Sequence, residues 1–168
     1  MRLPATASDA ERQREYEQVR ERIAALLDGE DDWIAALATV VAELHGAFDH
    51  YDWTGVYRLA RPDELVIGPY QGGHGCTRIR LDRGVCGAAA SSRRTQRVAD
   101  VATFPGHIAC AATTRSEIVV PLVTANGRVL GVLDVDSDQP AAFTEVDEAQ
   151  LGVIASDLAE RFATQALL

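Results

Sequence analysis

Apolar residues with helical spacing open the chain. After a capping box at residues 8–11, apolar side chains recur every three or four positions until Gly29, which predicts an amphipathic helix. Asp31 and Asp32 begin a second predicted helix that ends near Gly46. The two helices are expected to pack as a pair. The side chains expected to be buried are Tyr16, Val19, Ile23, Leu26 and Leu27 in the first helix, and Trp33, Leu37, Val40, Val41 and Leu44 in the second.

The pattern becomes strand-like from Asp52. Residues 53–59 and 65–67 flank a turn at residues 61–63, which predicts a hairpin. A long glycine-rich region follows, with short strands expected at residues 77–81 and 96–98 and a small helix at residues 87–92.

A capping box at Thr144 opens the last predicted helix, whose apolar side is Leu151, Ile154, Ala155, Leu158 and Phe162. Helices at both ends, with antiparallel strands and long loops between them, predict an α+β fold. We expect residues 1–168 to form a single domain, with residues 1–50 as a helical segment packed on it.

A second hairpin is expected around Asn126-Gly127, which separates the apolar runs 118–123 and 129–135. Asn-Gly is a strong signal for a two-residue hairpin turn because both central positions need positive φ. Such a turn would place Ala125 opposite Arg128.

This register brings three carboxylates together. It places Val119 opposite Asp134 and Glu117 opposite Asp136, and because side chains alternate with period two, all four share one face. Like charges are unfavourable opposite one another, and buried carboxylates need partners. A metal, a cationic ligand or shared protons could provide the neutralisation. A solvated face or a one-residue slip would disperse the cluster.

Composition limits the classes of partner. The chain has 168 residues, 47% of them hydrophobic, and a net charge of -9. That charge argues against nucleic acid or an anionic membrane as the main partner, because both require a basic surface. No apolar stretch approaches the length of a membrane span, and no signal peptide is expected, so a cytoplasmic protein is predicted. Its three cysteines would start as thiols in that reducing compartment.

Cys110 is the candidate nucleophile. It ends the loop 104–110, close to Glu117, where a small molecule could approach it. Its thiolate would be the reactive form, and His107 and Arg115 could supply positive potential. Neighbouring acids suit a substrate that is protonated as it is attacked, as a sulfoxide is.

The remaining thiols, Cys76 and Cys86, are candidates to resolve a sulfenic acid on Cys110 by forming a disulfide. An inert buried thiol is the common alternative for any one of them. Zinc is a second alternative, although the spacing is not typical of zinc sites; its possible ligands are His74, Cys76, Cys86, His107 and Cys110.

Two further readings concern the sheet face. Glu117, Asp134 and Asp136 could bind a hard cation such as Mg²⁺ or Ca²⁺. Trp53 and Tyr57 share a face of the first strand with Gly55, and they could form an aromatic wall against a methyl group or a cation, or could simply pack in the core.

Six ordered motifs resemble the free methionine-(R)-sulfoxide reductases built on a GAF domain, over about two thirds of the chain. Phe104-Pro-Gly-His-Ile-Ala-Cys110, together with all three cysteines, is the most specific of them. The other five are Trp53-Thr-Gly-Val-Tyr57, Gly68-Pro-Tyr-Gln-Gly72, Gly84-Val-Cys-Gly87, Ser116-Glu-Ile-Val-Val-Pro121 and Gly131-Val-Leu-Asp-Val-Asp-Ser137.

The resemblance implies a GAF-like domain with a central antiparallel sheet flanked by helices and an active site under loops on one sheet face. It also implies roles for the candidate residues. Cys110 would attack the sulfoxide sulfur, Cys76 would be the main resolving cysteine, and Cys86 would be an auxiliary one. The implied substrate-binding residues are Glu117, Asp134, Asp136, Trp53 and Tyr57. No metal or bound cofactor is implied. Thioredoxin with NADPH, or glutaredoxin, would restore the thiols, and a homodimer is possible.

The chain also departs from the family pattern. Gly73-His-Gly75 replaces a common lysine and alanine ahead of Cys76, and Ala111 stands where an acidic residue often follows the nucleophile. The first change could alter the rate of disulfide formation through the mobility of the loop. The alternative function is a GAF-type module that binds a small molecule or senses redox state without turnover.

Overall fold

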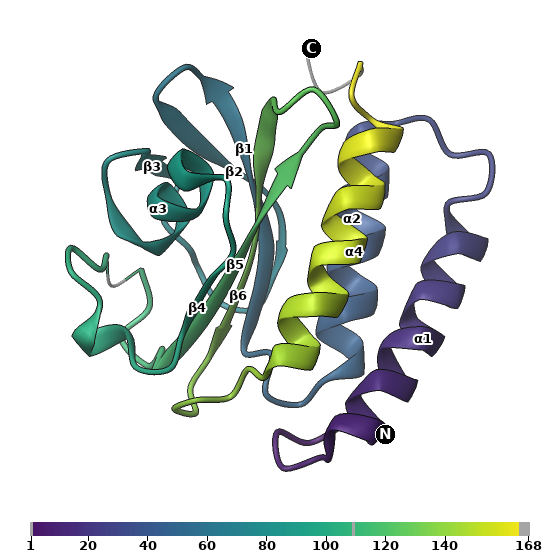
Figure 1. The fold of residues 1–168 in the computed structure, drawn as a ribbon, viewed down its shortest axis with the longest axis horizontal. Helices are drawn as coiled ribbons and strands as arrows, with labels where there is room; N and C mark the ends of the chain where they lie inside the picture. Colours follow the sequence, from purple (N-terminus) through teal and green to yellow (C-terminus); the bar gives the residue numbers. More distant parts are fainter. Residues whose placement is uncertain (1, 109, 165–168) are drawn as a thin grey trace.

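The computed structural model describes residues 2–108 and 110–164. These residues form a six-stranded antiparallel sheet in the order β3-β2-β1-β6-β5-β4, with helices α1, α2 and α4 on one face and α3 and long loops on the other (Figure 1). The helices are α1 Asp9–Leu26, α2 Trp33–Ala47, α3 Gly84–Ser92 and α4 Glu145–Arg161, with a short 3₁₀ helix at Val101–Thr103. The strands are β1 Trp53–Arg61, β2 Glu64–Gln71, β3 Arg78–Arg80, β4 Gln96–Val98, β5 Ser116–Val123 and β6 Val129–Ser137. The predicted α+β class is confirmed.

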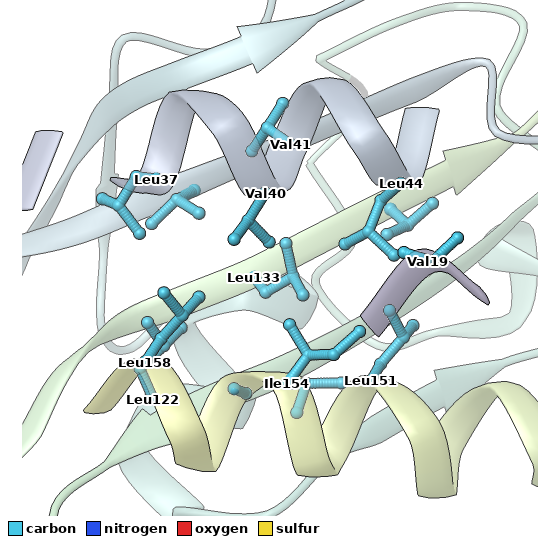
Figure 2. Packing of buried hydrophobic residues seen from close by; sticks show 14 of the residues in the cluster. Val19, Leu37, Val40, Val41, Leu44, Leu122, Leu133, Leu151, Ile154 and Leu158 are labelled. Atoms are coloured by element: carbon cyan, nitrogen blue, oxygen red, sulfur yellow. The ribbon is translucent and has the colours of Figure 1, made fainter. Parts of the chain in front are cut away.

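The apolar stripes of α2 and α4 form the main core. All five predicted residues of each stripe are buried, and Figure 2 shows Val40 and Ile154 converging on Leu133 of β6. Leu133 and Val135 point toward these helices, so the side chains between and beyond them point to the opposite face. Because α2 and α4 pack on one face of the sheet, with α1 outside them against both helices, the other face of the central strands is left for a site.

Two element predictions need correction. Leu26 is 56% exposed, because α1 ends there and Leu27, at the C-cap, turns inward instead. The small helix begins at Gly84, three residues earlier than predicted. Gly84 has φ +65°, a conformation that favours glycine, and this residue turns the chain into α3.

The turn of the second hairpin also differs from the prediction. Of the loop residues 125–127, only Gly127 has positive φ. The Thr124 amide donates to the Arg128 carbonyl, so the loop contains three residues rather than two. Next to this loop, the pairing of β5 with β6 is shifted by one residue from the predicted register, with Val123 opposite Val129. A β-bulge at Leu130 restores it, because Leu122 faces Gly131. The two departures cancel before the chain reaches the acidic residues.

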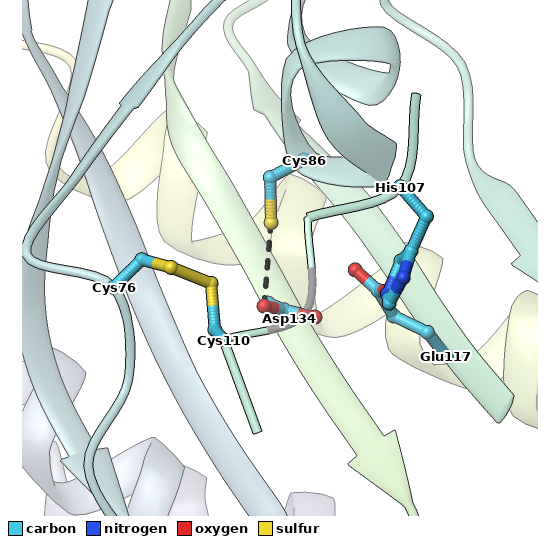
Figure 3. The surroundings of a disulfide bond; sticks show 6 residues. All are labelled: Cys76, Cys86, His107, Cys110, Glu117 and Asp134. Atoms are coloured by element: carbon cyan, nitrogen blue, oxygen red, sulfur yellow. Dashed lines mark hydrogen bonds and ion pairs between the residues drawn. A yellow bond between two sulfur atoms is a disulfide. The ribbon is translucent and has the colours of Figure 1, made fainter. Parts of the chain in front are cut away.

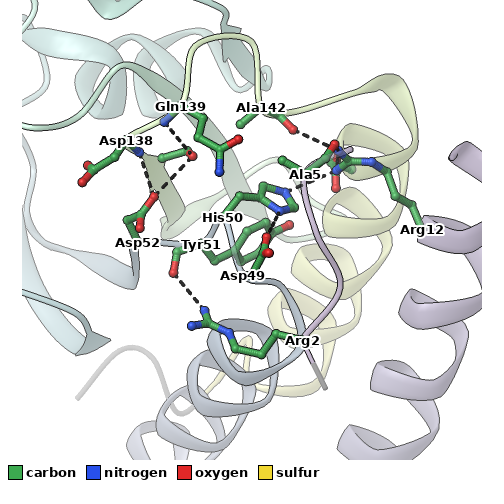
Figure 4. A network of polar contacts seen from close by, with 12 residues as sticks. Arg2, Ala5, Arg12, Asp49, His50, Tyr51, Asp52, Asp138, Gln139 and Ala142 are labelled. Atoms are coloured by element: carbon green, nitrogen blue, oxygen red, sulfur yellow. Dashed lines mark hydrogen bonds and ion pairs between the residues drawn. The ribbon is translucent and has the colours of Figure 1, made fainter. Parts of the chain in front are cut away.

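A buried ionic cluster fastens α1 to the rest of the molecule (Figure 4). Arg12 donates to Asp147 Oδ2 of α4 at 2.8 Å, and Tyr16 donates to Asp147 Oδ1 at 2.9 Å. Arg12 also contacts His50 Nε2 at 3.3 Å and donates to backbone carbonyls. Arg12 and Asp147 are no more than 1% exposed. Each charge is therefore compensated, as burial requires.

None of the helices formed by the described residues combines the length and hydropathy that a membrane crossing requires.

Candidate active site

Three acidic side chains line one cavity on the loop-covered face of the sheet. Glu117 pairs with Asp136 and Val119 pairs with Asp134, which confirms the predicted register. Glu117 and Asp134 are 6% and 5% exposed, and Asp136 is half-buried. All three carboxylates line the cavity, together with Cys110. The predicted convergence of acids and thiols is therefore present.

Burial keeps protons on these carboxyl groups. Removal from water raises the pKa of Asp134 to about 7. The pKa of Glu117 is raised well above its ordinary value by burial and by the charges of Asp134 and Asp136. The pKa of Asp136 is raised in the same way, although a hydrogen bond from Thr114 opposes the shift. The cluster can therefore hold protons near neutral pH and donate them.

These shifts predict that stability falls as pH rises. The pKa of Asp134 is about 7 in the folded chain against an ordinary 3.8, so between pH 4 and 7 the folded chain binds more protons than the unfolded chain. The free energy of unfolding of the disulfide form should therefore decrease as pH rises across this range. The contribution of one such group to the slope is at most roughly 1.4 kcal/mol per pH unit. Urea unfolding measured between pH 4 and 8 would check this.

Asp134→Asn should flatten that decrease, because the amide carries no proton to lose. The exposed Asp157 of α4 provides the matched control, and Asp157→Asn should leave the slope of the wild type unchanged. Stability that rises between pH 4 and 7 would contradict the buried, proton-holding cluster.

A disulfide between Cys76 and Cys110 closes over the acids (Figure 3). Their Cα atoms lie 5.2 Å apart although 34 residues separate them in sequence. The sequence left open which thiol would pair with Cys110, and in this structure it is Cys76. Within the part of the chain described, this pairing also removes two members of the possible zinc set.

Cys86 is a buried thiol beneath the disulfide, on α3. It donates to Asp134 Oδ2 at 3.3 Å. Burial, Asp134 and Glu117 raise the pKa of the Cys86 thiol well above its ordinary value. Cys86 is therefore held as a neutral thiol while the carboxylates surround it, which makes it a poor nucleophile in this state.

The aromatic wall is present and extends further than predicted. Trp53 and Tyr57 stack with ring centroids 5.8 Å apart, and both line the cavity. Tyr70 of β2 stacks on the outer side of Trp53 at 5.5 Å, a partner the sequence analysis missed because it lies on another strand. The indole covers Gly55, where a Cβ would collide with the ring. Glycine is required there for the wall to form.

His107 and Arg115 differ from their expected roles. His107 Nε2 lies 3.7 Å from Glu117 Oε2, so it faces the acids, and burial lowers the pKa of its imidazole. Arg115 is exposed and does not line the cavity. The expected positive potential from Arg115 is therefore wrong, because the chain turns outward just before β5 begins at Ser116.

The cavity has a volume of about 30 Å³, which holds only one or two water molecules. An amino acid does not fit in that space.

Among the described residues, one set of three potential metal ligands is close enough to share an ion. It consists of Cys86, Glu117 and Asp134, whose ligand atoms all lie within 4.8 Å of one another. Asp136 is not in this set, so the three acids alone do not form the hard-cation site considered from the sequence.

Comparisons with known proteins agree with this geometry. Residues 29–162 match the GAF domain family. The chain is 42% identical to the free methionine-R-sulfoxide reductase of Escherichia coli (strain K12), over 89% of each chain, and 46% identical to GAF domain-containing protein A of Dictyostelium discoideum, over 86% of this chain and 90% of that one.

Solved structures of free methionine-R-sulfoxide reductases are also similar to this chain over most of its length. The free methionine-R-sulfoxide reductase of Neisseria meningitidis, in complex with its substrate, superposes with a TM-score of 0.87 at 44% identity, covering 97% of this chain and 96% of that one. The reduced form of the Staphylococcus aureus fRMsr superposes with a TM-score of 0.80 at 39% identity, covering 91% and 95%.

Proposed function

The chain belongs to the GAF domain family and, within it, to the free methionine-R-sulfoxide reductases, and from this premise we propose that it reduces free L-methionine (R)-sulfoxide to L-methionine. The observation that carries the proposal is that Cys110, joined to Cys76 by a disulfide, lines one cavity with three carboxyl groups. A disulfide at that place is the product expected when the thiols reduce a bound oxidant.

In the first step, the Cys110 thiolate attacks the sulfoxide sulfur. The sulfoxide oxygen takes a proton from the carboxyl cluster and transfers to Cys110, which leaves methionine and a sulfenic acid. Burial raises the pKa of Glu117 and Asp134, so both groups can carry the proton at neutral pH. The sulfur of Cys110 is oxidised by two electrons, and the sulfur of the substrate is reduced by two.

In the second step, the Cys76 thiol attacks the sulfenic sulfur of Cys110. The S–O bond breaks, the hydroxyl leaves as water with the proton of Cys76, and the disulfide forms. The Cα separation of 5.2 Å supports this assignment of the resolving thiol. The auxiliary resolving role of Cys86 is carried over from the family resemblance, since its thiol lies buried beside Asp134 and is not part of this pair.

Trp53 and Tyr57 hold the methyl end of the substrate in this proposal. Their stacked rings form an apolar part of the cavity beside the carboxyl groups, since Trp53 pairs with Asp136 on the neighbouring strand. An apolar wall beside polar groups would orient the S=O bond toward the acids and away from the rings.

The reductant and the setting are parts of the same proposal. Thioredoxin with NADPH, or glutaredoxin, reopens the disulfide, and a cytoplasmic location supplies that reducing system. A homodimer stays a prediction and is tested by the mass of the protein in solution.

The decisive experiment measures NADPH oxidation coupled through thioredoxin and thioredoxin reductase. We expect sustained turnover with free methionine-(R)-sulfoxide and much slower turnover with the (S) form or with a peptide-bound sulfoxide. Absence of turnover with both thioredoxin and glutaredoxin would overturn the proposal. The methionine released per chain separates an enzyme from a redox sensor, because a sensor stops near one equivalent.

Removing a proton donor should slow the first step. Glu117→Gln keeps the size of the side chain but cannot supply the proton, and we expect kcat/KM to fall by about 10²–10³-fold, as for loss of a transition-state donor. The exposed Glu160 of α4 is the matched control, and Glu160→Gln should retain full activity. Equal rates for Glu117→Gln and the wild type would remove Glu117 from the mechanism.

A further inference from the structure

A second chemistry is available beneath the disulfide, because the trio Cys86, Glu117 and Asp134 has the form of a metal site. Their ligand atoms lie within 4.8 Å of one another, and all three residues are buried. They come from three separate elements, α3, β5 and β6, so the fold alone brings them together. We propose that this trio binds a divalent ion of the Zn²⁺ class and that the bound ion excludes the substrate.

An unpartnered oxygen supports this assignment independently of the cluster. Asp134 Oδ2 accepts the Cys86 thiol, but no donor among the described residues reaches the buried Asp134 Oδ1, so that apart from a proton shared between Asp134 and Glu117 this oxygen is unpartnered. Buried polar atoms are nearly always paired, so an orphan oxygen at a cavity points to a missing ligand. Asp134 also lines the cavity, which is the size of one or two waters and therefore of a single ion.

The charges around the cavity favour a cation. Glu117, Asp134 and Asp136 all line it, and among its described lining residues none is arginine or lysine. Among the described lining residues, the side chains that can become cationic are the two imidazoles of His74 and His107. A divalent ion would neutralise carboxylates that otherwise must retain protons.

The type of ligand selects the class of ion. A cysteine sulfur is soft, and together with two carboxylates it suits Zn²⁺ or Co²⁺ rather than Mg²⁺ or Ca²⁺, which prefer oxygen ligands and more of them. Three protein ligands leave one tetrahedral position for water or for His107. His107 Nε2 lies 3.7 Å from Glu117 Oε2, close enough for a small rotation to bring it to the ion.

The site does not depend on the redox pair. Cys76 and Cys110 are joined, whereas Cys86 is free, so the trio persists in the disulfide form. Binding converts the Cys86 thiol to a thiolate and releases its proton, with no change in oxidation state. Metal binding itself therefore stands apart from the proposed reductase activity, and only the exclusion of substrate rests on that activity.

The direct test titrates the disulfide form with Co²⁺ in the absence of any reductant. The chain has three cysteines, and Cys86 is the single free thiol of this form. We expect near-ultraviolet thiolate-to-Co²⁺ charge-transfer absorption that saturates at one ion per chain and is displaced by Zn²⁺. Release of at least one proton per ion in a weakly buffered solution should accompany it, from the Cys86 thiol and from whichever of Glu117 and Asp134 is protonated.

Variants distinguish direct ligation from general attraction to acids. Cys86→Ser should abolish the absorption and weaken Zn²⁺ binding by more than about 100-fold, since even outer-sphere partners cost roughly 10–100-fold. Glu117→Gln should weaken binding as well, which keeps the test decisive if Cys86→Ser fails to fold. Asp136→Asn is the matched control: this carboxylate lines the same cavity but is outside the trio, so the absorption should persist.

Three results would overturn the site: no charge-transfer absorption in the folded wild type, an unchanged absorption in folded Cys86→Ser, or a stoichiometry unrelated to Cys86. An absence of charge-transfer absorption in the wild type would mean that a proton shared between Glu117 and Asp134 compensates the burial of both carboxyl groups without a metal ion. In the reduced enzyme, Zn²⁺ should raise the KM for methionine sulfoxide, with reversal by a chelator. Metal binding without such competition would preserve the site and reject its effect on substrate.

Discussion

Replacing Cys110 with serine is expected to abolish turnover, lowering kcat by at least about 10³-fold as in enzymes that lose their nucleophile. The serine side chain keeps nearly the same shape, but its hydroxyl cannot take up the sulfoxide oxygen, whereas the cysteine sulfur does so and becomes a sulfenic acid. NADPH oxidation coupled to thioredoxin measures the loss, and direct quantification of methionine excludes an effect on the coupling enzymes.

Cys76→Ser is the informative counterpart, because it removes the resolving thiol and leaves the attacking one. It should release about one methionine per chain and then stop, with a sulfenic acid that dimedone traps on Cys110. Slow continued turnover that disappears in the Cys76→Ser/Cys86→Ser double variant would support the auxiliary role of Cys86. A Cys110→Ser variant that still releases methionine would assign the attack to another thiol and remove the mechanism proposed above.

Removing Arg12 is expected to destabilise the protein by about 3–5 kcal/mol. Its guanidinium is 1% exposed and donates to Asp147 Oδ2 at 2.8 Å, so Arg12→Met would leave a buried carboxylate without its counter-charge. Asp147 also accepts hydrogen bonds from Tyr16 and from the backbone amide of Thr144, which hold it in place after the substitution. Urea unfolding at pH 7 would measure the change.

Arg14→Met is the matched control, since Arg14 lies on the same helix and is exposed. Its effect should stay within about 0.5 kcal/mol. Similar stability for the two variants would mean that α1 is not fastened through this ion pair. Because the Arg12 cluster lies on the helical face of the sheet, Arg12→Met measured under folding conditions should change kcat little.

The candidate site was largely predictable because its acids lie on two neighbouring strands. Alternation of side chains places Glu117, Asp134 and Asp136 on one face whenever the hairpin register is right. That register was obtained from an Asn-Gly turn that the structure shows to be longer by one residue, and a bulge at Leu130 compensates for the error. Turn type depends on backbone angles that the amino-acid letters constrain only partly.

Contacts between distant segments were not predictable. The stacking of Tyr70 on Trp53, the thiol of Cys86 on Asp134 and the pairing of His107 with Glu117 each join different elements. Arg12 lies four residues before Tyr16 and therefore on the same face of α1 as the buried stripe, but the spacing within one helix does not identify its partners. Its burial depends on α4 and the chain around Ala142 packing against that side.

Periodicity was sufficient to define the helical stripes, the antiparallel strands and the shared face of the acids, because each follows from the geometry of a single element or of one hairpin. Three further features of the site are set by the tertiary structure alone. They are the pairing of Cys76 with Cys110, the burial that raises the carboxyl pKa values, and the convergence of α3, β5 and β6 on one small cavity. Those features arise from distances and desolvation between residues far apart in sequence, which no local pattern encodes.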